Sequence, residues 1–204
     1  DEALVGLGIS REEAGQYRDV FQGNVFLDKT KGEVHIGEVI ELVLDSFEEV
    51  MKAGPLAREP CLKLKVSLVD LKLHEDAIHR GPAQVYPAIR EAVREAFRGA
   101  TPTIFEPVQV HQIEAPVEYM GAVTSLVSSK RGNLIDVGQE SSGINIKAEL
   151  PVQEMIGWTS DLRSATEGRG FSSLVSQTFK KMPNELQVKV IKQIRDRKGL
   201  AENQ

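Results

Sequence analysis

Apolar side chains in the first half of the chain follow two different periods. Across residues 34–51 they recur at steps of one, three and four, which predicts an amphipathic helix that ends at Gly54 and Pro55. Across residues 62–68 they alternate with polar residues, as in a half-buried strand. The apolar face of that strand consists of Leu62, Leu64, Val66 and Leu68.

The chain after this strand shows a change of parity and then a second helical pattern. Beyond Leu68 the apolar residues change parity, which predicts a β-bulge or a transfer of the strand between two packed faces. The shifted positions are Val69, Leu71 and Leu73. The alternation breaks at His74, and a helical stripe then follows Pro82 and ends at Gly99. The sequence LHEDAIHRGPAQ, residues 73–84, therefore connects a strand to the N-terminus of a helix.

The second half of the chain alternates between strand-like and helix-like patterns. The expected elements are a strand at 108–114, a helix at 120–130, a hairpin of 134–137 and 144–150 across the turn ESSG, a helix ending at Gly168 and a strand at 171–179. The second of these helices carries Met155, Trp158, Thr159 and Leu162, with Trp158 expected in the core. This βαββαβ order predicts a ferredoxin-like split βαβ domain.

One more helix is predicted at the end of the chain. It begins at the N-cap Asn184, with Gln187 three residues further on, and ends before Gly199. Its inward positions are Leu186, Val190, Ile191 and Ile194. Because the pattern of the small sheet leaves no stripe to pair with this helix, we expect it to pack elsewhere.

Composition narrows the classes of protein that fit these patterns. The 204 residues, 41% of them hydrophobic, suffice for one large or two small domains. Lys and Arg total 25 against 30 Asp and Glu, which excludes a globally basic nucleic-acid coat but not a local basic face. The single cysteine, Cys61, excludes an internal disulfide and a cysteine-based zinc site, so the expected compartment is the reducing cytoplasm.

The start of the chain and its apolar runs bear on targeting. The acidic start lacks the basic region of a signal peptide, and no apolar run approaches the roughly 18 residues of a membrane span. The chain opens without an initiator methionine and within a helical pattern, which suggests a fragment of a longer protein.

The polar residues of LHEDAIHRGPAQ allow three interpretations. His74, Asp76 and His79 could supply imidazole and carboxylate ligands to a metal, as in a metal-dependent hydrolase. The sequence has no HExxH helix to support this, and the other two histidines, His35 and His111, belong to other elements. The cluster could also be an acid-base pair in a cleft. The third interpretation is a solvated turn in which Asp76 orders the loop, and the polarity of the stretch favours it.

Six sequence blocks carry a resemblance that covers nearly the whole chain. In order they are GNVFLDKTKGEVHIGEVIEL, GPLAREP, KLHEDAIHRGPAQVYPAIREA, PVEYMGAVTSLVSSKRG, PVQEMIGWTSDLRSATEGRG and RDRKGL. With them the chain resembles the carboxy-terminal part of archaeal-type members of the elongation factor two/elongation factor G family of translocation GTPases. The HRGPAQ form of the loop is similar to that of archaeal members.

The resemblance implies an α+β fold with two α/β-sandwich domains. Residues 1–106 would be a partial, ribosomal-protein-S5-like domain four that is incomplete at its N-terminus. Residues 107–182 would be the ferredoxin-like domain five, and residues 183–204 a C-terminal helix that packs back on domain four. The family's first strands of domain four would lie upstream of Asp1, and a short proline-containing tail usually follows.

The resemblance also assigns roles to the loop. His79 matches the histidine that archaeal and eukaryotic members convert to diphthamide. The loop would be the tip that enters the decoding region of the small ribosomal subunit, where an imidazole bearing a cationic extension suits contacts with RNA backbone. The tip residues would be His74, Asp76, Ile78, Arg80, Gly81 and Gln84, with Arg80 as the expected phosphate contact and with His74 and Gln84 as loop support.

Basic residues elsewhere have weaker assignments. Lys130 and Arg131 could touch ribosomal RNA, or could simply satisfy the carbonyl groups of a helix end. Arg163 and Arg169 resemble a family motif, and Arg163 could instead pair with an acid. The RDRKG run from Arg195 fits a favourable helix C-terminus with a solvated face.

The remaining expectations concern chemistry and partners. GEVHIGEV lacks the glycine spacing and the Lys-Ser/Thr pair of a nucleotide loop. The resemblance places GTP and Mg²⁺ in a nucleotide domain that this chain lacks, so no cofactor, catalytic residue or GTPase activity is expected in it. The implied partners are the ribosome, with its rRNA and the tRNA–mRNA at the decoding region, and the diphthamide biosynthesis enzymes. Neither a membrane nor DNA is expected as a partner.

Overall fold

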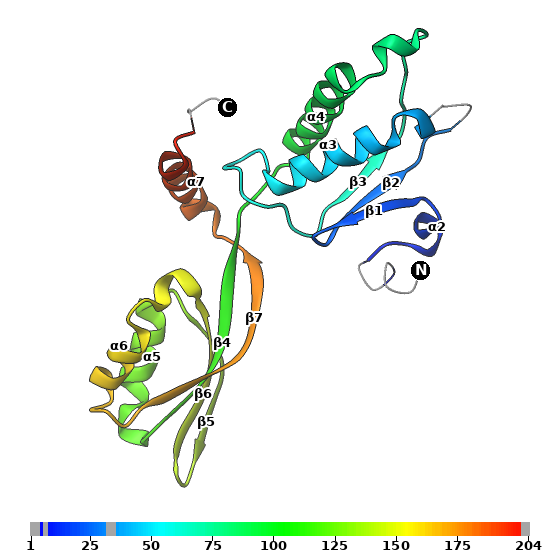
Figure 1. The fold of residues 1–204 in the computed structure, drawn as a ribbon. Coiled ribbons are helices and arrows are strands. Elements are labelled where there is room, and N and C mark those ends of the chain that lie inside the picture. Colours follow the sequence, from blue (N-terminus) through cyan, green and yellow to red (C-terminus); the bar gives the residue numbers. More distant parts are fainter. Residues whose placement is uncertain (1–4, 6–7, 32–35, 201–204) are drawn as a thin grey trace. The chain divides into compact units, whose positions relative to one another are not determined.

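The chain forms two compact units, each with its own sheet (Figure 1). The computed structural model describes residues 5, 8–31 and 36–200. The first unit comprises Asp1–Pro102 and Val188–Gln204, and the second comprises Thr103–Gln187.

The first unit is built on a three-stranded sheet in the order β1-β2-β3. The hairpin of β1 (Tyr17–Phe21) and β2 (Asn24–Asp28) turns at Gln22 and Gly23, which both have positive φ, as a two-residue hairpin turn requires. Strand β3 (Lys65–Leu68) runs parallel to β2. Both faces of β2 are buried, because Phe26 packs under the helices while Val25 and Leu27 join Ile9 in a smaller cluster with the stretch before α2 (Arg11–Ala14).

Two helices cover one face of this sheet (Figure 1). The first predicted helix is confirmed over α3 (Ile40–Lys52), with a buried stripe that includes Val43 and Phe47. It begins later than predicted, because the chain first forms the 3₁₀ turn η1 (Ile36–Glu38). The start predicted at Val34 and most of GEVHIGEV, namely residues 32–35, lie outside the described residues.

The second predicted helix of this unit is confirmed as α4 (Pro82–Gly99). Pro82 occupies the first helical turn, where its missing N–H costs no hydrogen bond. The helix buries Val85, Ile89 and Val93 against α3 and the sheet.

The strand between these helices is shorter than its alternating pattern predicts. It begins at Lys65, because Lys63 adopts a positive φ and Leu62 is exposed. The predicted bulge or transfer between faces is wrong, since the chain leaves the sheet after Leu68. Leu71 and Leu73 pack, without strand pairing, against the same cluster as Leu64, Val66 and Leu68, whereas Val69 is 69% exposed. An extended segment outside a sheet still alternates its side chains, which explains the misleading pattern.

The second unit has the predicted βαββαβ order and the ferredoxin-like strand arrangement. Its elements are β4 (Phe105–Ala115), η3 (Val117–Tyr119), α5 (Met120–Ser129), β5 (Asn133–Glu140), β6 (Gly143–Pro151), η4 (Val152–Met155), α6 (Trp158–Ala165) and β7 (Phe171–Lys181). The strands lie in the order β5-β6-β4-β7, and every neighbouring pair is antiparallel. Helices α5 and α6 cover one face (Figure 1), where Trp158 and Leu162 pack with Ile113 and Ile146.

The last helix, α7 (Asn184–Lys198), begins at the residue predicted as its N-cap. The four predicted inward side chains are half-buried, whereas Val188 on another side of the helix is 77% exposed. Its C-terminal half contacts the loop that follows α3. Arg195 donates to the carbonyl oxygen of Leu56 at 2.8 Å, and Lys198 donates to that of Arg58 at 2.7 Å. The basic run at this helix end therefore holds a loop of the first unit.

Candidate functional site

The stretch LHEDAIHRGPAQ forms an exposed loop at the N-terminal end of α4 (Figure 1). Its centre is the single 3₁₀ turn η2 (Ala77–His79), and Gly81 and Pro82 lead into the helix. All residues from 74 to 79 are exposed, and Ile78 is 76% exposed although it is apolar. We call residues 74–81 the tip loop.

Asp76 orders the turn through both its side chain and its backbone. Its carboxylate accepts a hydrogen bond from the backbone N–H of Ile78 at 3.1 Å, as an N-cap does. Its own N–H donates to Nδ1 of His74 at 3.1 Å. Because Nδ1 is the acceptor, the neutral His74 ring carries its proton on Nε2, which is then a hydrogen-bond donor.

Arg80 braces the tip loop from within. Its Nε donates to the carbonyl oxygen of His74 at 2.7 Å, and Nη2 donates to that of Glu75 at 2.9 Å. Nη1 pairs with the carboxylate of Glu38 in η1. The Arg80 side chain is only 19% exposed, so its cation is mainly engaged with the protein. Where the sequence predicted a phosphate contact, the geometry favours a residue that holds the loop together.

His79 lies exposed beside this brace. Its ring meets the ring of His74 edge to face, with 4.6 Å between the centroids. Within the part of the chain that the structure describes, the nitrogens of His79 make no hydrogen bond, so the imidazole is open to solvent. The structure therefore presents this imidazole at the surface and fixes the ring next to it.

The metal hypothesis finds no support in this geometry. Among residues 5, 8–31 and 36–200, no group of three or more His, Cys, Asp or Glu side chains could hold a metal ion. Nδ1 of His74 is occupied by the N–H of Asp76, and the Asp76 carboxylate is turned to Ile78. His74, Asp76 and His79 are thus neighbours in a loop rather than a convergent ligand set.

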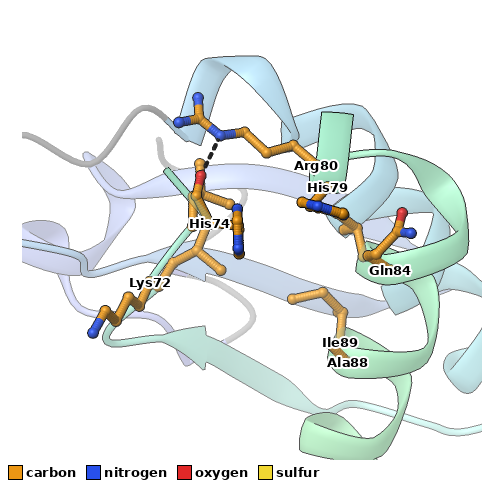
Figure 2. Close-up of a pocket in the computed structure, with 10 residues that line it drawn as sticks. Lys72, His74, His79, Arg80, Gln84, Ala88 and Ile89 are labelled. Carbon is orange, nitrogen blue, oxygen red and sulfur yellow. Dashed lines mark hydrogen bonds between the residues drawn. The ribbon is translucent and has the colours of Figure 1, made fainter. Parts of the chain in front are cut away.

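A cleft of about 410 Å³ lies beneath the tip loop (Figure 2). One wall is the extended segment 71–74 and the other is the beginning of α4. The apolar lining residues are Leu71, Leu73, Val85, Ala88 and Ile89, and the polar ones are Lys72, His74, His79, Arg80 and Gln84. In Figure 2 the rings of His74 and His79 lie above the side chain of Ile89. The sequence pointed to the polar residues, but the cleft arises only when the extended segment 71–74 and the helix come together.

The basic pair at the end of α5 is held by carboxylates of the second unit. The guanidinium of Arg131 forms two hydrogen bonds with Glu106, at 3.2 and 2.9 Å, and a third with Glu154 at 2.8 Å. The hydrogen bonds that Arg131 donates to Glu106 raise the pKa of Arg131. Lys130 lies 2.7 Å from the carboxylate of Asp161. Both cations are therefore engaged by carboxylates of the second unit, and Lys130 also donates to the carbonyl oxygen of Ile156 at 3.4 Å.

The two other arginines of the second unit differ from each other. Arg169 pairs with Glu118 at 3.0 Å and stacks over the ring of Tyr119 at 4.7 Å from its centroid. Arg163 is exposed, and its side chain makes no ion pair with another described residue. The pairing with an acid considered for Arg163 is thus not seen in the described part of the chain.

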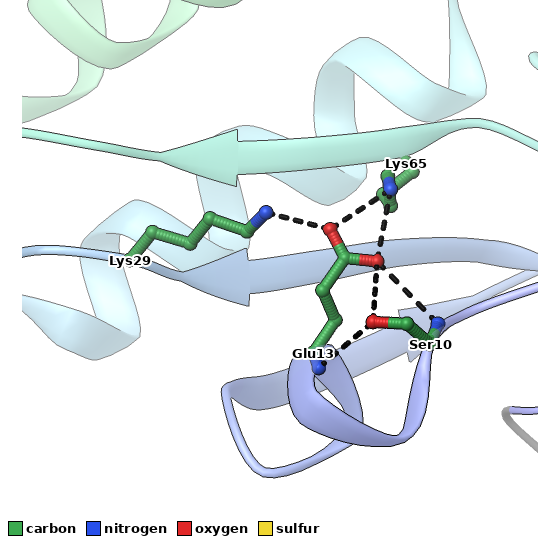
Figure 3. A network of polar contacts seen from close by, with 4 residues as sticks. All are labelled: Ser10, Glu13, Lys29 and Lys65. Atoms are coloured by element: carbon green, nitrogen blue, oxygen red, sulfur yellow. Dashed lines mark hydrogen bonds and ion pairs between the residues drawn. The ribbon is translucent and has the colours of Figure 1, made fainter.

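One polar network of the structure was not predicted from the sequence (Figure 3). Glu13 in α2 accepts hydrogen bonds from Lys29 at 2.6 Å and from Lys65 at 3.0 Å, and it closes a capping box with Ser10. The hydrogen bond from Lys29, followed by that from Lys65, lowers the pKa of Glu13 to about 2. The Ser-x-x-Glu spacing signals the capping box, but nothing in the sequence signals the lysines. The network joins α2 to the sheet and is structural.

Known proteins identify the class to which these two units belong. Residues 8–101 match the family model "Elongation factor G, domain IV", and residues 103–190 match "Elongation factor G C-terminus". The chain belongs to the elongation factor G/elongation factor two family of translation factors and corresponds to its fourth and C-terminal domains.

Similar proteins include elongation factors 2 from archaea. The chain is 50% identical over 197 residues to Elongation factor 2 of Nanoarchaeum equitans. The aligned residues cover 97% of the chain and 26% of that protein. It is 48% identical over 200 residues to that of Pyrococcus furiosus, covering 98% of the chain and 27% of the relative. The chain thus spans about a quarter of the length of the curated relatives it matches. Within the residues that the structure describes, no helix is long and apolar enough to cross a membrane.

Proposed function

We propose that this chain is the ribosome-contacting part of a translocation factor, in which the tip loop enters the decoding region as tRNA and mRNA move. The first unit acts as domain four, with α7 as its returning helix, and the second unit acts as domain five. Its action is steric and electrostatic: a rigid tip keeps the tRNA–mRNA pair from slipping back. The observation that supports this most directly is an exposed His79 on a loop braced by Arg80.

His79 is the proposed site of diphthamide formation, and the diphthamide biosynthesis enzymes are the proposed partners for that step. An enzyme can reach the ring because its nitrogens are not engaged with other described residues. Mass spectrometry of the chain produced with the archaeal enzymes should show the added mass on the peptide that contains His79. The His79→Gln variant should lack it, and an unmodified wild-type peptide would contradict the assignment.

GTP hydrolysis and Mg²⁺ binding are assigned to other domains of the full-length factor, which works in the cytoplasm. The two units on their own are proposed to neither bind nor hydrolyse GTP. Saturable GTP turnover by the purified chain would contradict this.

The brace offers a direct test in the full-length factor. Arg80→Ala should slow single-turnover translocation by about tenfold or more, because the tip loses its fixed shape, while GTP binding away from the ribosome stays unchanged. Arg94→Ala is the matched control, since Arg94 pairs with Glu91 on α4 outside the tip loop. Equal translocation rates for wild type and Arg80→Ala would refute the role of the tip. Lys130 and Arg131 would have to exchange their carboxylate partners before touching rRNA, so their proposed role there is secondary.

A further inference from the structure

The cleft beneath the tip loop has one apolar half and one half rich in hydrogen-bonding groups (Figure 2). Its floor belongs to the core of the first unit, because Val85 and Ile89 are buried and Leu71 and Leu73 pack against them. That floor is preformed. Its volume of about 410 Å³ lies within the range of small-ligand sites, roughly 300 to 1,000 Å³.

Three polar groups at the rim lack partners among the described residues. They are the Nε2–H of His74, the ring nitrogens of His79 and the side-chain amide of Gln84. Together they offer both donors and acceptors beside two aromatic rings. Such a rim fits a flat ligand with a hydrogen-bonding edge that stacks on an imidazole, which is how unstacked nucleobases are held by proteins.

The charge of the lining adds a second requirement. None of the ten lining residues is acidic, whereas Lys72 and Arg80 are cationic. The Arg80 charge is partly compensated by Glu38, but Lys72 is exposed and makes no ion pair with a described residue. A ligand that combines a flat apolar body with a negative charge is therefore favoured over a neutral or cationic one.

We infer that this cleft accepts one unstacked nucleobase of a single-stranded RNA segment, with the adjoining phosphate near Lys72. The base contacts the apolar floor and the His79 ring, and Gln84 and His74 bond its edge. This inference rests on the proposed function for the presence of RNA at the tip. It adds that the tip holds RNA by a base pocket, and not by shape and charge alone.

The test uses the 204-residue chain and two probes of equal charge, hexaadenylate RNA and the all-abasic ribose phosphate hexamer. Methyl NMR signals of Leu71, Val85 and Ile89 should shift saturably with hexaadenylate, and the abasic hexamer should bind at least about tenfold more weakly. Equal affinity for the two probes, or no response of these methyl groups, would overturn the inference.

Two substitutions on the same helix localise the binding. Ala88→Leu should fill the cleft and reduce hexaadenylate affinity at least tenfold, because Ala88 is an exposed lining residue on α4. Ala92→Leu places the same side chain on the exposed surface one turn further along, outside the lining, and should bind as wild type does. Both replace one good helix former with another. Unchanged affinity in Ala88→Leu would refute the pocket.

Failure of this inference can be told apart from failure of the proposed function. The binding test contains no ribosome, so a negative result leaves the translocation assay of Arg80→Ala untouched. Normal translocation by Arg80→Ala would in turn leave the binding result valid for this cleft.

Discussion

The guanidinium of Arg80 pairs with the carboxylate of Glu38, 42 residues earlier in the chain. The same side chain donates to the carbonyl oxygens of His74 and Glu75. One residue thus closes the tip loop on itself and fastens it to the turn that precedes α3.

Removal of the Arg80 brace should loosen the tip loop without unfolding the chain. Arg80→Ala is expected to raise hydrogen exchange of the amides from 76 to 80 by about tenfold or more, since the loop carbonyl groups lose their donor. Global stability should change by only about 1 kcal/mol, because the ion pair is partly exposed. Arg80→Lys should restore little of the protection of these amides, since an ammonium group cannot reach the same three acceptors at once. Unchanged exchange in Arg80→Ala would refute the brace.

The cap at Asp76 should depend on geometry and not on charge. Asp76→Ala removes the acceptor for the Ile78 N–H and should destabilise η2 locally by about 1 kcal/mol. Asp76→Asn keeps an oxygen acceptor and should retain most of the protection of that amide. Hydrogen exchange of Ile78 measures both. If Asn is as damaging as Ala, the charge matters and the capping explanation is wrong.

The stability of the first unit should fall with acid through Glu13. Its folded pKa is about 2, below the ordinary value of 4.5, because Lys29 and Lys65 donate hydrogen bonds to the carboxylate. A lowered pKa stabilises the folded state above pH 4.5, and this contribution is lost as the pH falls from 4.5 to about 2. Urea denaturation should show Glu13→Gln less stable than wild type at pH 7 and nearly equal to it at pH 2. A constant difference across that range would contradict the linkage.

The second unit should lose stability at a higher pH because of His111. Burial lowers the pKa of this imidazole below its ordinary value of 6.5, so its neutral form is favoured in the fold. The unfolded chain therefore binds a proton more readily, and stability declines as the pH falls from about 6.5 toward the lowered folded pKa.

Trp158 reports this transition directly. It is the single tryptophan of the sequence, and its ring lies 6.4 Å from that of His111. Urea denaturation followed by its fluorescence should show the wild type less stable at pH 5.5 than at pH 7. The His111→Gln variant should show a smaller loss. His79→Gln is the control, because its exposed ring lies in the first unit and should leave the pH dependence as it is.

Arg131 should contribute mainly to the stability of the second unit. Arg131→Met leaves the buried Glu106 carboxylate without its bidentate partner and should cost about 3 kcal/mol. Adding Glu106→Gln should recover part of that loss, because an uncharged amide is less costly to bury. Urea denaturation of the single and double variants measures this. A stable Arg131→Met variant with defective ribosome binding would favour the rRNA contact instead.

Residues close in sequence account for most elements that were predicted correctly. The stripes of α3, α4 and α5, the ESSG hairpin and the βαββαβ order all follow from periods of apolar residues within short windows. The resemblance, carried by residue blocks, gave the family. The bulge after Leu68 was predicted wrongly for the same local reason, because an extended segment alternates its side chains whether or not it is paired.

The sequence by itself determined most of the helices and strands after residue 36, their order and the surface loop that carries His79, but it did not predict the hairpin of β1 and β2. Tertiary structure alone decided which partners the charged side chains have, both in that loop and elsewhere in the chain. Arg80 pairs with Glu38, which is 42 residues away in the chain. Arg131 pairs with Glu106 at a separation of 25 residues, and Glu13 pairs with Lys65 at a separation of 52. Such pairs depend on which elements meet in space, and no local period encodes that. The cleft under the tip loop has the same origin, since its two walls become neighbours only when α4 packs on the core.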